Sequence, residues 1–272
     1  MKRHPLITFF VLSYAIGWGL IPFWTFAAFS PLVAAFVVIS LTQGLSGLKE
    51  LGLRMIRWRV RWYWYVVAIA LPLTVVMLTA GLNVALGASA PSMIQFSSVS
   101  TILLVFAVRL VNPGDGPMGE EPGWRGFALP GLQSSLSPLV STVILAVLVT
   151  GWHVPILFLE EGGLQPSFFV GYLLGSVAVT FWYTWMFNHT GGSVLITIIS
   201  HSAQGTITVS GFWSAGADLA QANLLFGVVA SAVAIGLVLF DWKAWRGPAP
   251  APATTVLSAP PTPREAAPVT PA

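Results

Sequence analysis

Residues 119–127 read Gly-Glu-Glu-Pro-Gly-Trp-Arg-Gly-Phe, so this stretch combines two adjacent carboxylates, Glu120 and Glu121, with Arg125. The rest of the chain is strongly apolar: 56% of its 272 residues are hydrophobic and only 8% are charged. A soluble domain carries about 25% charged residues. The composition therefore predicts a polytopic membrane protein, in which ionisable residues are costly and commonly functional.

The apolar runs predict an all-α fold with about eight transmembrane helices. We expect residues 1–246 to form one transmembrane domain. Residues 247–272 are rich in proline, alanine and threonine, and we expect them to be a disordered cytoplasmic tail. The predicted spans are residues 6–29, 32–45, 62–86, 101–111, 138–159, 168–187, 193–212 and 224–240.

Basic residues set the predicted orientation in the membrane. The short segment 46–61 carries Lys49 and four arginines against one acid, Glu50, so we expect a basic loop in the cytoplasm. With eight spans, both termini then lie in the cytoplasm, as does Arg109 near the end of the fourth span. We expect a multi-pass protein of the plasma membrane, surrounded by the lipid bilayer, with a cavity that opens toward the cytoplasmic side.

The composition also excludes several classes of function. A formal net charge of +3 is too small and too scattered to indicate a nucleic-acid partner. The chain has no cysteine, which excludes disulfides, thiolate nucleophiles and cysteine-ligated metals. The polar groups within the apolar segments are therefore the candidates for function.

Three such groups come from different segments and predict one shared pocket. They are the acid pair with its arginine (Glu120, Glu121, Arg125), the group Trp152-His153-Val154-Pro155, and the group His201-Ser202-Ala203-Gln204-Gly205. A water-attacking protease needs a base that takes a proton from water and donors that stabilise the oxyanion. Side chains of these kinds are present, and we expect Trp124 and Trp152 to line the pocket.

Local spacing predicts different roles for the two adjacent acids. Pro122 suits the first position of a new helix, which would place Glu121 near its N-cap. Arg125 would then lie one turn beyond Glu121, at an i,i+4 separation that allows the two to pair. That pairing would leave Glu120 free for chemistry.

The pattern Glu120-Glu121-x-x-x-Arg125, followed by His153 and His201, resembles the CAAX protease and bacteriocin-processing family, also called CPBP or Abi. The string Glu-Glu-Pro-Gly-Trp-Arg-Gly-Phe-Ala-Leu-Pro over residues 120–130 is similar to many bacterial members, and so is Trp-His-Val-Pro. The resemblance covers about residues 105–206. The first motif alone occurs by chance on soluble helices, but three motifs in order within an apolar chain are specific.

The resemblance implies an intramembrane glutamate endopeptidase that hydrolyses a peptide bond of a membrane-associated protein or peptide. By similarity, Glu120 is the general base and His153 orients or activates the water. Glu121 and Arg125 shape the site, and His201 acts with the residue four positions on to hold the oxyanion. No metal cofactor is implied. Zinc is the second choice, because two histidines and a glutamate can bind it, although the chain has no His-Glu-x-x-His pair.

The chain departs from the family pattern at two positions. Val149 stands where the family usually has an aromatic residue four positions before the histidine, and Gly205 stands where it usually has asparagine. Glycine has no side-chain donor, so His201, Gln204 and the Gly205 backbone are the candidates for oxyanion stabilisation. The alternative function is a catalytically weak or silent membrane scaffold or immunity protein. A proton-coupled transporter is a third hypothesis, against which the lack of an internal repeat counts.

Overall fold

The computed structural model describes residues 3–159 and 164–248, and all regular structure in these residues is helical, which confirms the predicted all-α class. The predicted tail, residues 247–272, lies outside the described residues except for its first two. The helices are α1 (Pro5–Gly19), α2 (Ser30–Thr42), α3 (Gly44–Met55), α4 (Tyr63–Ala85), α5 (Val99–Val111), α6 (Gly116–Gly123), the π-helical turn η3 (Trp124–Ala128), α7 (Leu129–Gln133), α8 (Pro138–His153), α9 (Pro166–His189), α10 (Val194–Thr206), α11 (Gly216–Phe240) and α12 (Trp242–Arg246). Short 3-10 turns lie at η1 (Ile21–Phe23), η2 (Ile94–Phe96), η4 (Val154–Phe158) and η5 (Val209–Gly211).

The described residues contain 6 helical stretches that are long and apolar enough to cross a membrane, so the protein is a multi-pass membrane protein. The predicted count of eight is not confirmed, because α2 and α10 have only 13 residues each. The 6 stretches are Pro5–Phe23, Tyr63–Ala85, Val99–Gln133, Pro138–Phe158, Pro166–His189 and Gly216–Phe240.

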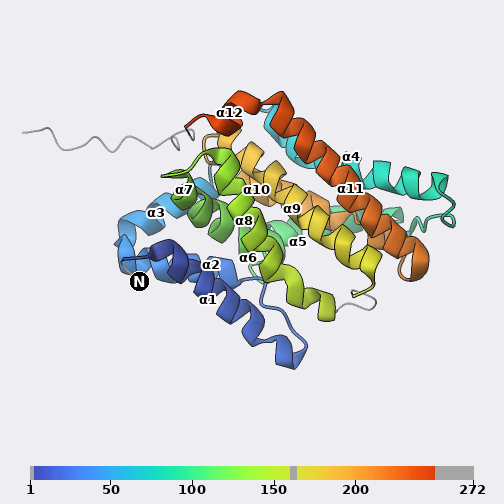
Figure 1. Cartoon of the computed structure of the whole chain (residues 1–272), viewed down its shortest axis with the longest axis horizontal. Helices are drawn as coiled ribbons and strands as arrows, with labels where there is room; N and C mark the ends of the chain where they lie inside the picture. Colours follow the sequence, from blue (N-terminus) through green and yellow to red (C-terminus); the bar gives the residue numbers. More distant parts are fainter. Residues whose placement is uncertain (1–2, 160–163, 249–272) are drawn as a thin grey trace, which may run out of the picture.

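Helix α10 lies inside the bundle rather than forming a simple span. It packs against α4, α5, α6 and α9, and it buries polar side chains together with apolar ones. Figure 1 shows α9 and α11 side by side over much of their length. They approach closely because Gly171 and Gly227 face the partner backbone without a Cβ, and a side chain at either position would overlap it.

The two ends of the bundle are defined by contacts between segments distant in sequence. At the first end, which we call the basic end (residues 54–64, 189–193 and 241–246), Ser193 Oγ donates a hydrogen bond of 2.7 Å to the Arg57 carbonyl. At the opposite, distal end (residues 83–98 and 206–218), Asn83 Nδ2 donates a hydrogen bond of 3.0 Å to the Asp218 carbonyl. In Figure 1, α3, α7 and α12 lie toward the basic end, and the first turns of α11 lie at the distal end.

Residues 46–55 of the predicted basic loop are helical, which corrects the interpretation of residues 46–61 as a loop. Helix α3 forms there because Leu48, Leu51 and Met55 recur at helical spacing, and all three pack against the main core cluster. Arg54 on α3 donates a hydrogen bond of 2.9 Å from Nη1 to the Gly126 carbonyl in η3. The segment therefore joins the surface of the basic end to the helix that carries the acid pair.

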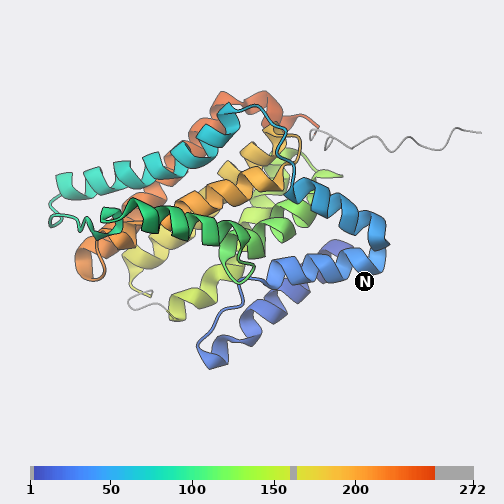
Figure 2. The same cartoon turned by 180° about the vertical axis from the view of Figure 1, so that it is seen from behind.

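Helices α5, α6, η3 and α7 together cross the bundle once, and Figure 2 shows α5 (green) leading directly into α6. Residue Gln95, just before α5, contacts Gly211 at the distal end, whereas Gly131 in α7 contacts Leu6 near the start of α1. The acid pair therefore lies near the middle of the bundle. Arg109 lies beside α10 in the distal half, next to Gly205.

Candidate active site

The acid pair lies in the middle of α6, whose start the sequence analysis misplaced. Asp115 caps α6, because its Oδ1 accepts a hydrogen bond of 2.8 Å from the Gly116 amide. Pro122 therefore lies inside the helix rather than at its first position, and Glu121 is not an N-cap. An internal proline removes one donor of the helical ladder, and the π-helical turn η3 follows at Trp124–Ala128. The Asp-Gly-Pro sequence at 115–117 is a stronger signal for the start of this helix than Pro122.

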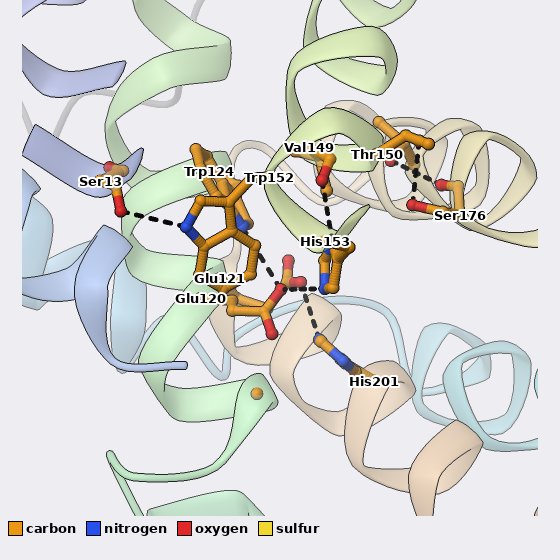
Figure 3. A network of polar contacts seen from close by, with 12 residues as sticks. Ser13, Glu120, Glu121, Trp124, Val149, Thr150, Trp152, His153, Ser176 and His201 are labelled. Atoms are coloured by element: carbon orange, nitrogen blue, oxygen red, sulfur yellow. Dashed lines mark hydrogen bonds and ion pairs between the residues drawn. The ribbon is translucent and has the colours of Figure 1, made fainter. Parts of the chain in front are cut away.

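Glu120 faces His153, which is the last residue of α8 (Figure 3). The distance from His153 Nε2 to Glu120 Oε2 is 3.5 Å. His153 Nδ1 lies 2.8 Å from the Val149 carbonyl, which can only accept, so Nδ1 carries a proton and Nε2 faces the carboxylate. Trp124 Nε1 donates a hydrogen bond of 3.4 Å to the same Glu120 oxygen. At 3.5 Å the Glu120 and His153 pair leaves its polar atoms available to a water molecule that contacts both.

Glu121 is held more tightly than Glu120. Its Oε1 accepts a hydrogen bond of 3.1 Å from Arg125 Nη1 and another of 3.0 Å from His201 Nδ1. The predicted i,i+4 contact between Glu121 and Arg125 is therefore present, and both side chains are buried. Because Nδ1 of His201 donates to Glu121, its Nε2 is the ring nitrogen left for other partners. That nitrogen points toward Gly116 and Glu120.

Tyr183 on α9 completes this half of the site and was missed by the sequence analysis. Its ring stacks on His201 with centroids 5.4 Å apart, and the Arg125 guanidinium lies 4.9 Å from the ring centroid. Its hydroxyl donates a hydrogen bond to Gln204 Oε1. The sequence contained a signal, since Ser176, Thr180 and Tyr183 place polar groups on one face of an apolar span.

A cavity of about 310 Å³ brings together the five residues predicted as catalytic. Its wall includes Glu120, Glu121, Arg125, His153 and His201, as well as Gln204 and Tyr183. Trp124 and Trp152 do not line it; both are fully buried in the core cluster behind the acids, and Trp152 Nε1 donates to the Ser13 carbonyl at 3.1 Å. They support the site from outside the cavity.

Arg109 occupies the space next to Gly205. A Cβ added to Gly205 would overlap the Arg109 guanidinium, so the side chain that this position lacks is replaced in space by one from α5. Arg109 Nη1 also lies 3.2 Å from Oδ2 of Asp115, the residue that caps α6. Arg109 therefore connects α10, one turn after His201, to the start of the helix that carries the two acids. Nothing in the sequence spacing indicated this contact.

The described residues include no group of three or more histidine, cysteine, aspartate or glutamate side chains arranged to hold a metal ion. The two histidines of the site contact different acids, His153 with Glu120 and His201 with Glu121. The polar atoms of the site are therefore arranged as two acid and histidine pairs.

Comparison with known proteins agrees with the resemblance drawn from the motifs. Residues 98–207 match the family model described as type II CAAX prenyl endopeptidase Rce1-like. A search of curated proteins found no match. The matched segment contains both acids, Arg125, Arg109 and both site histidines. The segment that builds the cavity's polar core is thus similar to the Rce1-like type II CAAX prenyl endopeptidases, a family of membrane proteases.

Proposed function

We propose that the protein is an intramembrane endopeptidase that uses a water molecule activated by Glu120 to hydrolyse a peptide bond of a membrane-associated protein or peptide. The observation that carries this proposal is the cavity wall on which Glu120 faces His153 at 3.5 Å while Glu121 is already bound by Arg125 and His201. One carboxylate is thus available to water and the other is not. The matched family of membrane proteases supports the same class of reaction.

In the proposed reaction, Glu120 takes a proton from a water molecule that His153 Nε2 also contacts. The water oxygen adds to the substrate carbonyl carbon, and the electron pair of the C=O double bond moves to the carbonyl oxygen. Glu120 then gives its proton to the amide nitrogen as the C–N bond breaks, which yields a carboxylic acid and an amine. Atoms and charge balance with one water consumed.

The oxyanion formed in the first step needs a donor close to the same wall. We assign this role to His201, whose Nδ1 contacts Glu121 and whose Nε2 points toward Gly116 and Glu120. Arg125 adds a positive charge on the cavity wall. The proposed mechanism uses no metal. We also propose that the protein lies in a plasma membrane with both termini in the cytoplasm, as its basic residues favour.

One observation favours the second candidate, a membrane scaffold or immunity protein with weak or no catalysis. Gly205 offers no side-chain donor to an oxyanion, and the neighbouring Arg109 is bound to Asp115. Removing one oxyanion donor costs about 10²–10³ in rate in a characterised protease. A silent protein would keep the cavity but show no Glu120-dependent cleavage.

The test is a cleavage assay on the purified full-length protein in proteoliposomes. The probe is a pool of membrane-anchored peptides of mixed sequence, with new termini read by mass spectrometry. We expect Glu120→Ala and His153→Ala each to abolish cleavage, while the control His4→Ala, an exposed histidine, retains it. Full activity in both site variants would contradict the mechanism, and no cleavage by the unaltered protein would favour the scaffold.

A further inference from the structure

The two ends of the bundle differ sharply in their number of basic residues. The basic end and its neighbouring helices carry Lys49, Arg54, Arg57, Arg59, Arg61, Lys243 and Arg246. At the distal end, residues 83–98 and 206–218 contain no lysine or arginine, and their one charged residue is Asp218. Lysine and arginine concentrate in the cytoplasmic loops of membrane proteins. The basic end is therefore the cytoplasmic end, and the distal end faces the other side of the membrane.

The cavity is closed toward the basic end. Its floor is formed by Glu121, Arg125 and Tyr183. One turn further toward the basic end, α9 and α10 place Phe187 and Ile198 in the core, each at most 3% exposed, and Val194 beyond them is fully buried. Neither water nor a peptide can pass through such packing without displacing it.

The cavity extends in the opposite direction. Its wall continues along α9 from Tyr183 to Gly171, beyond α10 to Ser210, and along α11 to Asn223. Gly171 and Asn223 belong to the first turns of α9 and α11, which begin at the distal end. Ser210 is exposed, so the wall reaches the surface there.

We propose that the cavity is entered from the distal end, and that the substrate is a peptide segment presented on the non-cytoplasmic side of the membrane. The identity of the substrate as a peptide rests on the proposed function, whereas the side of entry rests on the closed floor and the charge division. The sequence predicts both a cavity that opens toward the cytoplasm and a basic segment that lies in the cytoplasm. These two predictions cannot both hold, because the cavity reaches the surface at the end opposite to that segment.

The mouth of the cavity also indicates the chemistry of the entering segment. Its polar groups are the uncharged side chains of Thr208, Ser210 and Asn223, and its deeper wall carries the apolar side chains of Val76, Val179 and Phe226. Uncharged polar groups at the rim suit the amides of an extended backbone, and the apolar wall suits uncharged side chains. Among the described residues of this rim, none offers an opposite charge to a segment dense in lysine or glutamate.

The absence of cysteine from the chain makes this proposal directly testable, because any single introduced cysteine is the only thiol. Two exposed serines serve as matched positions: Ser210 at the cavity mouth and Ser46 in α3 at the opposite end. Cells that express Ser210→Cys or Ser46→Cys are treated with a membrane-impermeant maleimide before and after permeabilisation. We expect intact cells to label Ser210→Cys fully, and Ser46→Cys only after permeabilisation.

The label also reports whether the mouth is the route to the acids. Attaching the maleimide to Ser210→Cys from outside should strongly reduce cleavage of the peptide pool, while the same label on Ser46→Cys in permeabilised cells leaves cleavage unchanged. Labelling of Ser46→Cys but not Ser210→Cys in intact cells overturns the proposal, and so does full cleavage by the labelled Ser210→Cys protein. Outside labelling of Ser210→Cys in a protein that cleaves nothing before labelling refutes the proposed function and leaves the orientation standing.

Discussion

Glu120 and Glu121 are neighbours in sequence but occupy opposite kinds of environment. Glu121 is bound by Arg125 and His201 through one oxygen, whereas the charged contact of Glu120 is a single histidine at 3.5 Å. Consecutive residues on a helix point about 100° apart, which sends one acid toward the floor of the cavity and the other toward its water-accessible wall. In the proposed mechanism, a buried ion pair fixes the site while an adjacent, less tightly held acid performs the chemistry.

The largest expected difference separates Glu120→Gln from Glu121→Gln. Loss of a general base lowers the rate of cleavage by about 10²–10⁴, and we expect Glu120→Gln to do so with little change in thermal unfolding. Glu121→Gln leaves Arg125 as an unpaired buried cation, so it should destabilise the protein by about 3–5 kcal/mol. Cleavage rates and unfolding curves of both variants in the same detergent measure the two effects.

The matched control is Glu50→Gln, a half-exposed acid whose partner is Arg54 on α3. It should change neither rate nor unfolding much, since exposed ion pairs contribute about 0–1 kcal/mol. Equal loss of stability in Glu120→Gln and Glu121→Gln would break the distinction drawn between the two acids.

Replacing Gly205 by asparagine should reduce activity, not increase it, because a Cβ at this position overlaps the Arg109 guanidinium. Overpacking of this kind costs about 1–3 kcal/mol. The double variant Gly205→Asn with Arg109→Ala removes the overlap and should recover part of the loss. A gain of activity from Gly205→Asn alone would show that Arg109 moves away readily and that the glycine is a defect in catalysis.

A smaller effect is expected at Tyr183, which supports the Glu121 half of the site through its ring. Tyr183→Phe keeps the ring between His201 and Arg125 and loses only the hydrogen bond to Gln204. One such bond contributes about 0.5–1.5 kcal/mol. Unfolding should shift slightly, and Tyr183→Ala should shift it much further; similar shifts for both would assign the role to the hydroxyl.

The smallest effect is expected from removal of metal ions. The site is organised as two separate acid and histidine pairs, so dialysis against a chelator should leave the cleavage rate unchanged. The measurement is the cleavage rate before and after dialysis, with added zinc as the second arm. A rate lost on dialysis and restored by zinc would contradict the metal-free mechanism.

The sequence predicted the class of fold and the members of the candidate site better than their arrangement. The i,i+4 spacing of Glu121 and Arg125 sufficed to predict their pairing, because helix geometry alone brings those positions together. Pro122 was misread because proline is common at the first position of a helix, yet here Asp115 caps a helix that already begins at Gly116.

The contacts that sequence reasoning missed join segments distant in the chain. No local rule links Arg109 to Gly205, or Tyr183 to His201, because these pairs form only when α5 and α9 pack against α10. The direction in which the cavity extends within the bundle could not be predicted for the same reason. It depends on which end of the surrounding helices is filled by large side chains, and the hydropathy of the sequence does not reveal this.

The π-helical turn at Trp124–Ala128 fixes how α6, which carries the two acids, is rotated relative to α7. A π turn accommodates one extra residue, so everything after it is rotated relative to a regular helix by about 100°. Deleting one residue there would restore regular geometry and turn the acids away from the cavity relative to the anchored α7. The number of residues in this turn therefore matters for the position of the acids. We expect an insertion or deletion there to impair the site far more than a substitution does.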